Sequence, residues 1–385
     1  MCPDSARRGP LTVRTPTSGP VRAHTARPAS ATAYAGTERI PGLACAARAG
    51  TMRRPARICR TRASPRRPRT VNRELPAPAP PQSAASAAAT AASEPPAWWV
   101  RLIAHVPLVL LDRVADLLGW LAFHVFPYRD AVVRDNLARA FPEWDAQRMR
   151  TVRRDYYRGF AQMLIEVIKS AVLPAAELRR RVRIVNVDAP RAYLSQGQSV
   201  LLAAAHQCNW EWMLLALSLE LGYPIDAAYK PLVDPWAERE MKKLRSRFGC
   251  RLIPAKHLLA DIIQRGKVTR AIAMVADQEP TTSERKHWTR FLNRDTAFYM
   301  GPEEIARVTR LPVFFITLRR VRRGYYEMAF EPLSAPGERL AAGVLTERYV
   351  RAVEQQILAA PADWPWSHKR WKLKKSLYAG AARRS

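Results

Sequence analysis

The stretch Ser199-Val-Leu-Leu-Ala-Ala-Ala-His206-Gln-Cys-Asn-Trp-Glu211-Trp decides the fold and locates the chemistry of this chain. The continuous apolar run over residues 199–205 is typical of a buried strand. From Trp212 onward the pattern is that of a largely buried helix, which ends at Gly222. His206 and Glu211 therefore lie on a strand-to-helix connection, at the carboxyl end of a strand. In open α/β sheets, ligand-binding and catalytic groups collect at that edge.

His206 and Glu211 are the residue types that general-base chemistry requires. An imidazole can remove a proton near neutral pH, and a carboxylate on its other ring nitrogen fixes the tautomer and stabilises the imidazolium. The same spacing also fits a hydrogen-bonded core histidine beside a surface glutamate. Spacing alone favours that structural interpretation, so the rest of the chain has to decide between the two.

Strand and helix patterns alternate along the rest of the chain. Further strands are predicted at 226–230, 250–254, 270–276, 312–319 and 325–333, and helices at 145–170, 210–221, 235–248, 257–265, 302–309 and 346–360. Asp145 and Asp234 are predicted N-caps, and helix 235–248 is expected to bury Trp236, Met241, Leu244 and Phe248. The alternation predicts an α/β fold, with a mainly parallel mixed sheet flanked by helices on both faces.

The composition indicates an anionic partner and argues against a metal site. The chain has 385 residues, enough for one large or two ordinary domains, and a net charge of +30. The five cysteines are scattered without metal-ligand spacing, so we expect no structural disulfide, no metal and no cofactor. Cys208 could be imagined as a nucleophile, but no helix start or basic neighbour is evident to lower its pKa. We therefore interpret Cys208 as a small packing residue.

Residues 1–96 differ in kind from the rest. They carry fifteen of the 31 prolines and a single aromatic residue, Tyr34, so they cannot bury enough apolar surface to offset the cost of ordering. We predict a disordered extension rich in Arg, Pro and Ala. Its Arg, Ser and Thr content also fits a transit peptide, although no amphipathic period runs through it. We favour a third interpretation, an upstream extension of the reading frame that is dispensable for activity.

Residues 97–126 are apolar but interrupted by charge. The interrupting residues are Arg101, His105, Asp112, Arg113 and Asp116. A membrane-spanning helix needs about 20 consecutive apolar residues, which these interruptions prevent. Trp98, Trp99 and Trp120 favour the headgroup region of a bilayer. We therefore predict membrane-associated helices that lie in one leaflet, with a buried helical pair of a soluble protein as the alternative.

Five short blocks follow one another between residues 98 and 375. They are Asn136-Leu-Ala-Arg-Ala-Phe141-Pro142; His206-Gln-Cys-Asn209-Trp210-Glu211; Tyr229-Lys230-Pro231 with Arg245-x-x-Phe-Gly249; Asp277-Gln278-Glu-Pro280; and Trp364-Pro-Trp366-Ser-His368-Lys-Arg370-Trp371-Lys372. In this order they resemble the late (lauroyl and myristoyl) acyltransferases of lipid A biosynthesis, which have a glycerolipid acyltransferase-like fold. Each block alone is a weak signal, but five in the right order are highly specific.

The resemblance implies an O-acyltransferase that needs no cofactor. A fatty acyl chain would move directly from the thioester of acyl carrier protein to a hydroxyl of a membrane glycolipid, a lipid A precursor. His206 would be the general base, and Glu211 would orient it. The substrate-binding candidates are Asn209, Lys230, Arg245, Asp277 and Gln278.

Three of these candidates, Lys230, Arg245 and Asp277, are charged, and each has an expected role. Lys230 and Arg245 could hold acceptor phosphate or developing oxyanion charge, although solvated surface charges are nearly as good an interpretation. The family usually has Arg where this chain has Lys230, so a point charge replaces a bidentate fork. Asp277 closes a predicted strand and could orient a basic residue at the edge that carries His206, or cap a loop.

The predicted organisation is a 1–96 extension, a 97–126 membrane-associated segment and a 127–378 acyltransferase domain. The C-terminal basic patch fits anionic headgroups or the acidic carrier protein. Its members are His368, Lys369, Arg370, Lys372, Lys374 and Lys375, with Trp364, Trp366 and Trp371 among them. Because the donor would be cytoplasmic and the acceptor a bilayer lipid, we expect the protein at the cytoplasmic face of the inner membrane.

Two alternatives stay open. An acyltransferase for a lysophospholipid or another glycolipid would share the same blocks, because the acceptor pocket is not a short motif. A basic nucleic-acid-binding protein would explain the charge. We expect no nucleic acid, however, because no recognition motif is present and residues 97–126 would be left unexplained.

Overall fold

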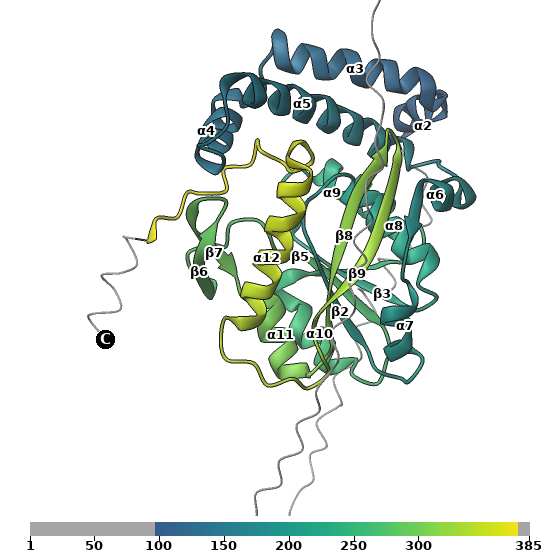
Figure 1. Ribbon diagram of the computed structural model, residues 1–385. Helices are drawn as coiled ribbons and strands as arrows, with labels where there is room; N and C mark the ends of the chain where they lie inside the picture. Colours follow the sequence, from purple (N-terminus) through teal and green to yellow (C-terminus); the bar gives the residue numbers. More distant parts are fainter. Residues whose placement is uncertain (1–96, 376–385) are drawn as a thin grey trace, which may run out of the picture. The chain divides into compact units, whose positions relative to one another are not determined.

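Within residues 97–375, which the computed structural model describes, seven strands form a central sheet (Figure 1). The strands are β1 (Val182–Ile184), β2 (Val200–Ala204), β3 (Ile225–Tyr229), β4 (Arg251–Pro254), β5 (Ala271–Val275), β8 (Val313–Arg322) and β9 (Tyr325–Ser334). Their order is β1-β9-β8-β2-β5-β3-β4. Strands β8, β2, β5, β3 and β4 are parallel, whereas β9 is antiparallel to β8. The prediction of a mainly parallel mixed sheet is confirmed.

Helices cover both faces of this sheet (Figure 1). One face is covered by α6 (Ala175–Arg181), α7 (Asp188–Leu194), α8 (Trp210–Glu220) and α9 (Pro235–Ser246), the other by α10 (Leu258–Gln264), α11 (Gly301–Thr309) and α12 (Val344–Ala359). Strand β2 shows why both faces need cover. Leu201 and Ala203 pack in the core beneath α12, and Leu202 and Ala204 in the core beneath α8. A strand buried on both sides has an uninterrupted apolar sequence.

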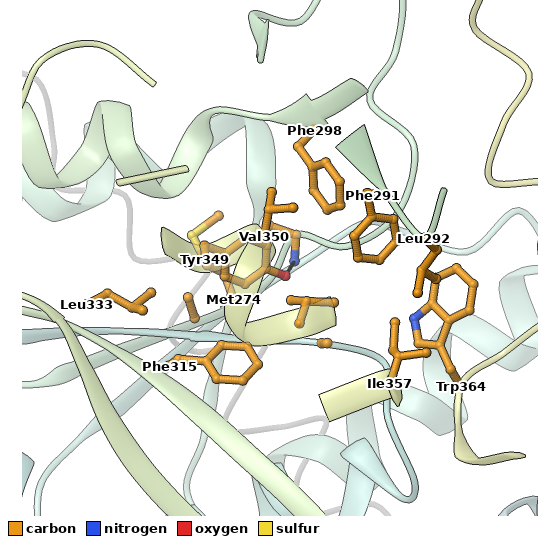
Figure 2. Packing of buried hydrophobic residues seen from close by; sticks show 14 of the residues in the cluster. Met274, Phe291, Leu292, Phe298, Phe315, Leu333, Tyr349, Val350, Ile357 and Trp364 are labelled. Atoms are coloured by element: carbon orange, nitrogen blue, oxygen red, sulfur yellow. Dashed lines mark hydrogen bonds between the residues drawn. The ribbon is translucent and has the colours of Figure 1, made fainter. Parts of the chain in front are cut away.

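Tyr349 of α12 lies at the centre of the first of these cores (Figure 2). Its ring packs against Phe315 and Phe298, with centroid distances of 5.8 and 6.5 Å. Its hydroxyl donates to the carbonyl oxygen of Ala204 at 2.8 Å and accepts from the backbone N–H of Ala276 at 3.2 Å. Tyr349 therefore links the carboxyl ends of β2 and β5 and fixes the distance between the residues that follow them.

The first helices of the described part of the chain lie beyond the carboxyl edge of the sheet (Figure 1). They are α2 (Trp98–His105), α3 (Leu108–His124), α4 (Asp130–Ala140) and α5 (Ala146–Lys169). Helix α3 packs on α5 through Leu111, Ala115 and Ile165. At Gly119 the two helices come so close that an added Cβ would lie 2.8 Å from the Cα of Arg158. Only glycine permits that approach.

The acidic residues that interrupt the apolar segment face the protein. Asp116 lies 2.7 Å from both Arg158 and Arg323, and these guanidinium groups lower its pKa to about 2. Asp112 also pairs with Arg323, at 3.5 Å. The exposed side of α3 is largely apolar in consequence. Among the helices of residues 97–375, none is long and apolar enough to cross a membrane.

The predicted elements and caps agree with the structure, apart from the burial expected in one helix and several elements that were not predicted. Asp145 and Asp234 accept hydrogen bonds from the N–H groups of Arg148 and Ala237, so both N-caps are confirmed. Helix α9 was expected to bury Trp236, Met241, Leu244 and Phe248, but Trp236 is exposed and the other three are only partly buried. Helices α4, α6 and α7, strand β1 and the antiparallel hairpin of β6 (Lys286–Phe291) and β7 (Arg294–Tyr299) were not predicted. The predicted extension of residues 1–96 lies outside the described residues.

The hairpin was missed because of its turn. Leu292 and Asn293 both have positive φ, 47° and 60°, as a two-residue hairpin turn requires. Leucine rarely adopts such a φ, and no glycine marks the turn in the sequence. The structure holds Leu292 in place through its N–H, which donates to Glu354 at 2.6 Å, and by burial of its side chain.

Candidate active site

His206 and Asp277 meet at the carboxyl edge of the sheet. Strands β2 and β5 are neighbours with Ala204 opposite Val275, and each of the two residues comes two positions after the end of its strand. The Nδ1 atom of His206 lies 2.6 Å from Oδ1 of Asp277. The backbone N–H of His206 donates to Oδ2 of the same carboxylate at 3.1 Å. The proposed site is therefore built from two adjacent parallel strands.

Asp277 is held as an anion. Its side chain is 1% exposed, and burial alone would raise its pKa. The charge and hydrogen bonds of His206, with the indole N–H of Trp364 at 3.0 Å, outweigh burial and hold the pKa of Asp277 below its usual value. An anionic Asp277 accepts the proton of Nδ1, which leaves Nε2 as the basic nitrogen of His206. The His206 side chain is 15% exposed, so solvent reaches part of the ring.

Glu211 has a different partner, so the prediction that it orients His206 is wrong. Its carboxylate, in the first turn of α8, accepts two hydrogen bonds from Arg245 of α9, at 2.6 and 2.8 Å. It also accepts from the indole N–H of Trp210 at 3.1 Å. The Trp210 ring lies edge-on to the His206 ring, 5.1 Å away. Glu211 thus fixes a wall of the site rather than the base.

Asn209 is buried, which contradicts its predicted contact with substrate. Its Oδ1 accepts from the N–H of Trp212, so Asn209 is the N-cap of α8. Its Nδ2 donates to Glu166 of α5 at 2.8 Å. Glu166 also accepts from Tyr326 at 2.7 Å and Gln162 at 2.8 Å, although burial raises its pKa. Sequence reasoning missed Glu166, because nothing in its helical pattern distinguishes it from a surface glutamate.

Comparison with known proteins identifies the family. The model of the bacterial lipid A biosynthesis acyltransferases matches residues 96–373. The chain belongs to this family. A lipid A biosynthesis acyltransferase of Haemophilus influenzae is 21% identical over 70% of this chain and 84% of its own length. Two Escherichia coli relatives are a lipid A biosynthesis palmitoleoyltransferase (21% identical, covering 71% of this chain and 87% of that one) and a lauroyltransferase (23%, 70% and 88%).

The remaining substrate-binding candidates of this acyltransferase occupy different positions. Gln278 is exposed, with its Nε2 3.4 Å from Nε2 of His206. Lys230 is exposed where β3 ends, at the same edge of the sheet. Arg245 is mostly buried and paired with Glu211. Substrate contacts of Lys230, Arg245 and Gln278 stay predictions.

The C-terminal segment of this acyltransferase is only partly the basic surface patch that was predicted. Trp364, Trp366 and Arg370 are buried, whereas the four lysines of the patch are at least partly exposed. Arg370 donates to the carbonyl oxygens of Asp277 and Ala297, both at 2.6 Å, and burial lowers its pKa to about 10. Trp364 and Arg370 of this segment therefore both donate hydrogen bonds to Asp277 and hold it in place.

His368 and Cys208 complete the surroundings of the site. Burial, with the charge of Arg370, lowers the pKa of His368 to about 4, so this imidazole is neutral at pH 7. Cys208 is buried, and burial raises the pKa of its thiol well above the usual value. A buried thiol of this kind is a poor nucleophile, which supports the interpretation of Cys208 as a packing residue. In residues 97–375, no three His, Cys, Asp or Glu side chains are grouped to hold a metal ion.

Proposed function

We propose that the protein transfers a fatty acyl chain from acyl carrier protein to a hydroxyl of a lipid A precursor, with His206 as general base. The observation that carries this proposal is the 2.6 Å contact between His206 Nδ1 and Asp277 at the carboxyl edge of the sheet. Through that contact Asp277 fixes the ring and keeps the proton on Nδ1, so that Nε2 can act as the base. Asp277 takes the orienting role that the sequence suggested for Glu211.

The proposed reaction is a direct transfer. Nε2 of His206 takes the proton of the acceptor hydroxyl as its oxygen attacks the thioester carbonyl carbon. The carbon–sulfur bond then breaks, and the imidazolium returns the proton to the leaving thiolate. Asp277 stabilises the imidazolium between these two steps. The buried, high-pKa thiol of Cys208 offers no support for an acyl-enzyme route.

The acceptor in this proposal is a bilayer lipid, and the protein works at the cytoplasmic face of the inner membrane. The exposed apolar side chains of α3 support this location, among them Val109, Leu110, Val114, Leu117 and Trp120. A helix whose exposed side is largely apolar is suited to lie in a bilayer interface. The relatives named for lauroyl and palmitoleoyl transfer give the chain lengths to try first.

Reconstituted transfer tests the proposal. The purified full-length chain is incubated with acyl carrier proteins loaded with different acyl chains and with an underacylated lipid A precursor, and products are identified by mass spectrometry. We expect one added acyl chain per acceptor. His206→Ala should lower the rate by about a hundredfold or more without loss of fold, as expected for a lost general base.

The matched control is His257→Ala. His257 is an exposed histidine near the end of β4, and its replacement should leave the rate unchanged. Near-normal transfer by folded His206→Ala would contradict the mechanism. If acyl transfer occurs only when a lysophospholipid or another glycolipid is supplied instead, the proposal that a lipid A precursor is the acceptor is contradicted. The assignment of His206 as general base would not be affected by that result.

A further inference from the structure

The loop between β3 and α9 presents an apolar tip to solvent. Leu232, Val233 and Trp236 are all exposed, and among them Val233 is fully so. Leu232 and Val233 are adjacent in the loop, and Trp236 follows in the first turn of α9. Two hydrogen bonds hold this conformation, from the N–H of Leu232 to Glu238 at 2.9 Å and from the N–H of Ala237 to Asp234 at 2.7 Å. The apolar side chains are therefore held outward by the loop's own structure.

This tip continues onto helix α2. The Trp236 ring stacks on Trp99, with centroids 5.3 Å apart and planes inclined by 25°. The backbone N–H of Ala97 donates to Glu240 of α9 at 3.2 Å. We call the combined surface the edge patch. It consists of Trp98, Trp99, Leu102, Leu232, Val233 and Trp236, all of them exposed.

The charges around the edge patch suit an anionic surface. Arg101, Lys230 and Arg239 are exposed and lie within three residues of its members in the sequence. Of the nearby acids, the exposed Asp234 caps α9 through the N–H of Ala237, and the other two are paired within α9, Glu238 with Lys242 at 2.8 Å and Glu240 with Lys243 at 3.2 Å. Tryptophans ringed by basic side chains are typical of surfaces that enter the headgroup layer of a membrane.

The edge patch also lies on the side of the sheet that carries the site. Strand β3 is separated from β2 only by β5, and the three strands are parallel. The β3–α9 loop therefore leaves the sheet at the same edge as His206. A bilayer in contact with this loop would face the general base.

We propose that the edge patch inserts into an anionic lipid bilayer and sets the site against the membrane surface. Leu232 and Val233 enter the boundary between headgroups and acyl chains, while Lys230 stays at the headgroup level. This inference rests on the proposed function only in taking a bilayer lipid as acceptor. Membrane insertion of the loop can be measured without any acyl transfer.

The test compares two double variants of the full-length chain. Leu232→Glu with Val233→Glu charges the tip. Ile263→Glu with Val308→Glu adds the same charges to exposed apolar residues at the ends of α10 and α11, which lead into the amino ends of β5 and β8. Each protein is titrated with vesicles of phosphatidylethanolamine and phosphatidylglycerol, and flotation gives the lipid concentration for half-binding. Circular dichroism checks the fold of each variant.

We expect the lipid concentration for half-binding to rise at least about tenfold in the tip variant, because two apolar side chains that enter the bilayer are replaced by anions. The control pair should differ from wild type by less than about twofold. Apolar insertion should also keep wild-type protein bound in high salt. Equal losses in both variants, or no loss in the tip variant, would overturn the proposal. Loss of vesicle binding in the tip variant alone, together with absence of acyl transfer in wild type, would sustain the membrane site and contradict the proposed function.

Discussion

Two carboxylates lie near His206: Glu211, five residues later in the chain, and Asp277, which follows the neighbouring strand. Their hydrogen-bond partners show that they have different roles. Asp277 contacts the imidazole directly, whereas Glu211 forms a bidentate pair with Arg245. The Glu211 side chain is buried and Arg245 largely so. When one member of such a pair is removed, the other is left as an uncompensated charge in a poorly solvated place. When both are removed, that penalty disappears.

Replacement of Glu211 and Arg245 by leucine should therefore be strongly non-additive. Each single variant is expected to lower the free energy of unfolding by about 2–4 kcal/mol, and the double variant by clearly less than the sum. Urea denaturation of the wild type and the three variants measures the coupling. Additive losses would show that the two side chains do not stabilise each other, and the ion pair would then no longer explain the position of Glu211.

At the scale of elements, the segment that carries His206 is clamped between α5 and α8. Asn209 caps α8 with its Oδ1 and binds Glu166 of α5 with its Nδ2. The Trp212 indole donates to the backbone carbonyl of Glu166 at 3.0 Å. Glu166 thus binds the connection both through its side chain and through its backbone. Burial raises the pKa of Glu166 despite the three donors around it.

A raised pKa for Glu166 has a defined effect on stability. The folded protein holds this proton at pH values where the unfolded chain, with a carboxyl near 4.5, has released it. The stabilisation that comes from this proton is fully present below pH 4.5 and is lost as pH rises through the pKa of Glu166 in the folded protein. The glutamine of Glu166→Gln cannot titrate. The free energy of unfolding of wild type should therefore fall relative to that of the variant as pH rises above 4.5.

Urea unfolding of wild type and Glu166→Gln over a pH series measures that change. Glu143→Gln, which makes the same substitution at an exposed position before α5, serves as the matched control. A stability difference that is constant with pH, or that moves in favour of wild type as pH rises, would contradict a raised pKa for Glu166 in the folded protein.

At the scale of the whole molecule, sequence patterns predicted elements better than the contacts between them. The apolar run before His206 and the N-caps Asp145 and Asp234 depend on local chain properties, and all three were predicted correctly. The sequence placed Asp277 at the sheet edge that carries His206 but did not pair the two, because Asp277 lies 71 residues away and the order of strands in the sheet brings them together. Glu211 is near in sequence, yet the first turn of α8 directs it to α9.

The same limit explains the other differences. The buried partners Glu166, Trp364 and Arg370 come from distant segments, and their types alone suggest surface residues or headgroup contacts. The acids in α3 interrupt the apolar pattern, but the structure directs them towards Arg158 and Arg323. The local sequence cannot show on which side of a helix a neighbouring arginine lies.

The most direct test of the proposed mechanism is the turnover number of Asp277→Asn beside that of Glu211→Gln. Both are measured in the reconstituted transfer assay on protein whose fold is checked by circular dichroism. Asp277→Asn should lower the turnover number by about a hundredfold or more, because the amide can neither fix the Nδ1–H tautomer nor stabilise the imidazolium. Glu211→Gln should cost clearly less. A near-normal rate for Asp277→Asn, with Glu211→Gln as slow as His206→Ala, would contradict the assignment of Asp277 as the carboxylate that orients the base.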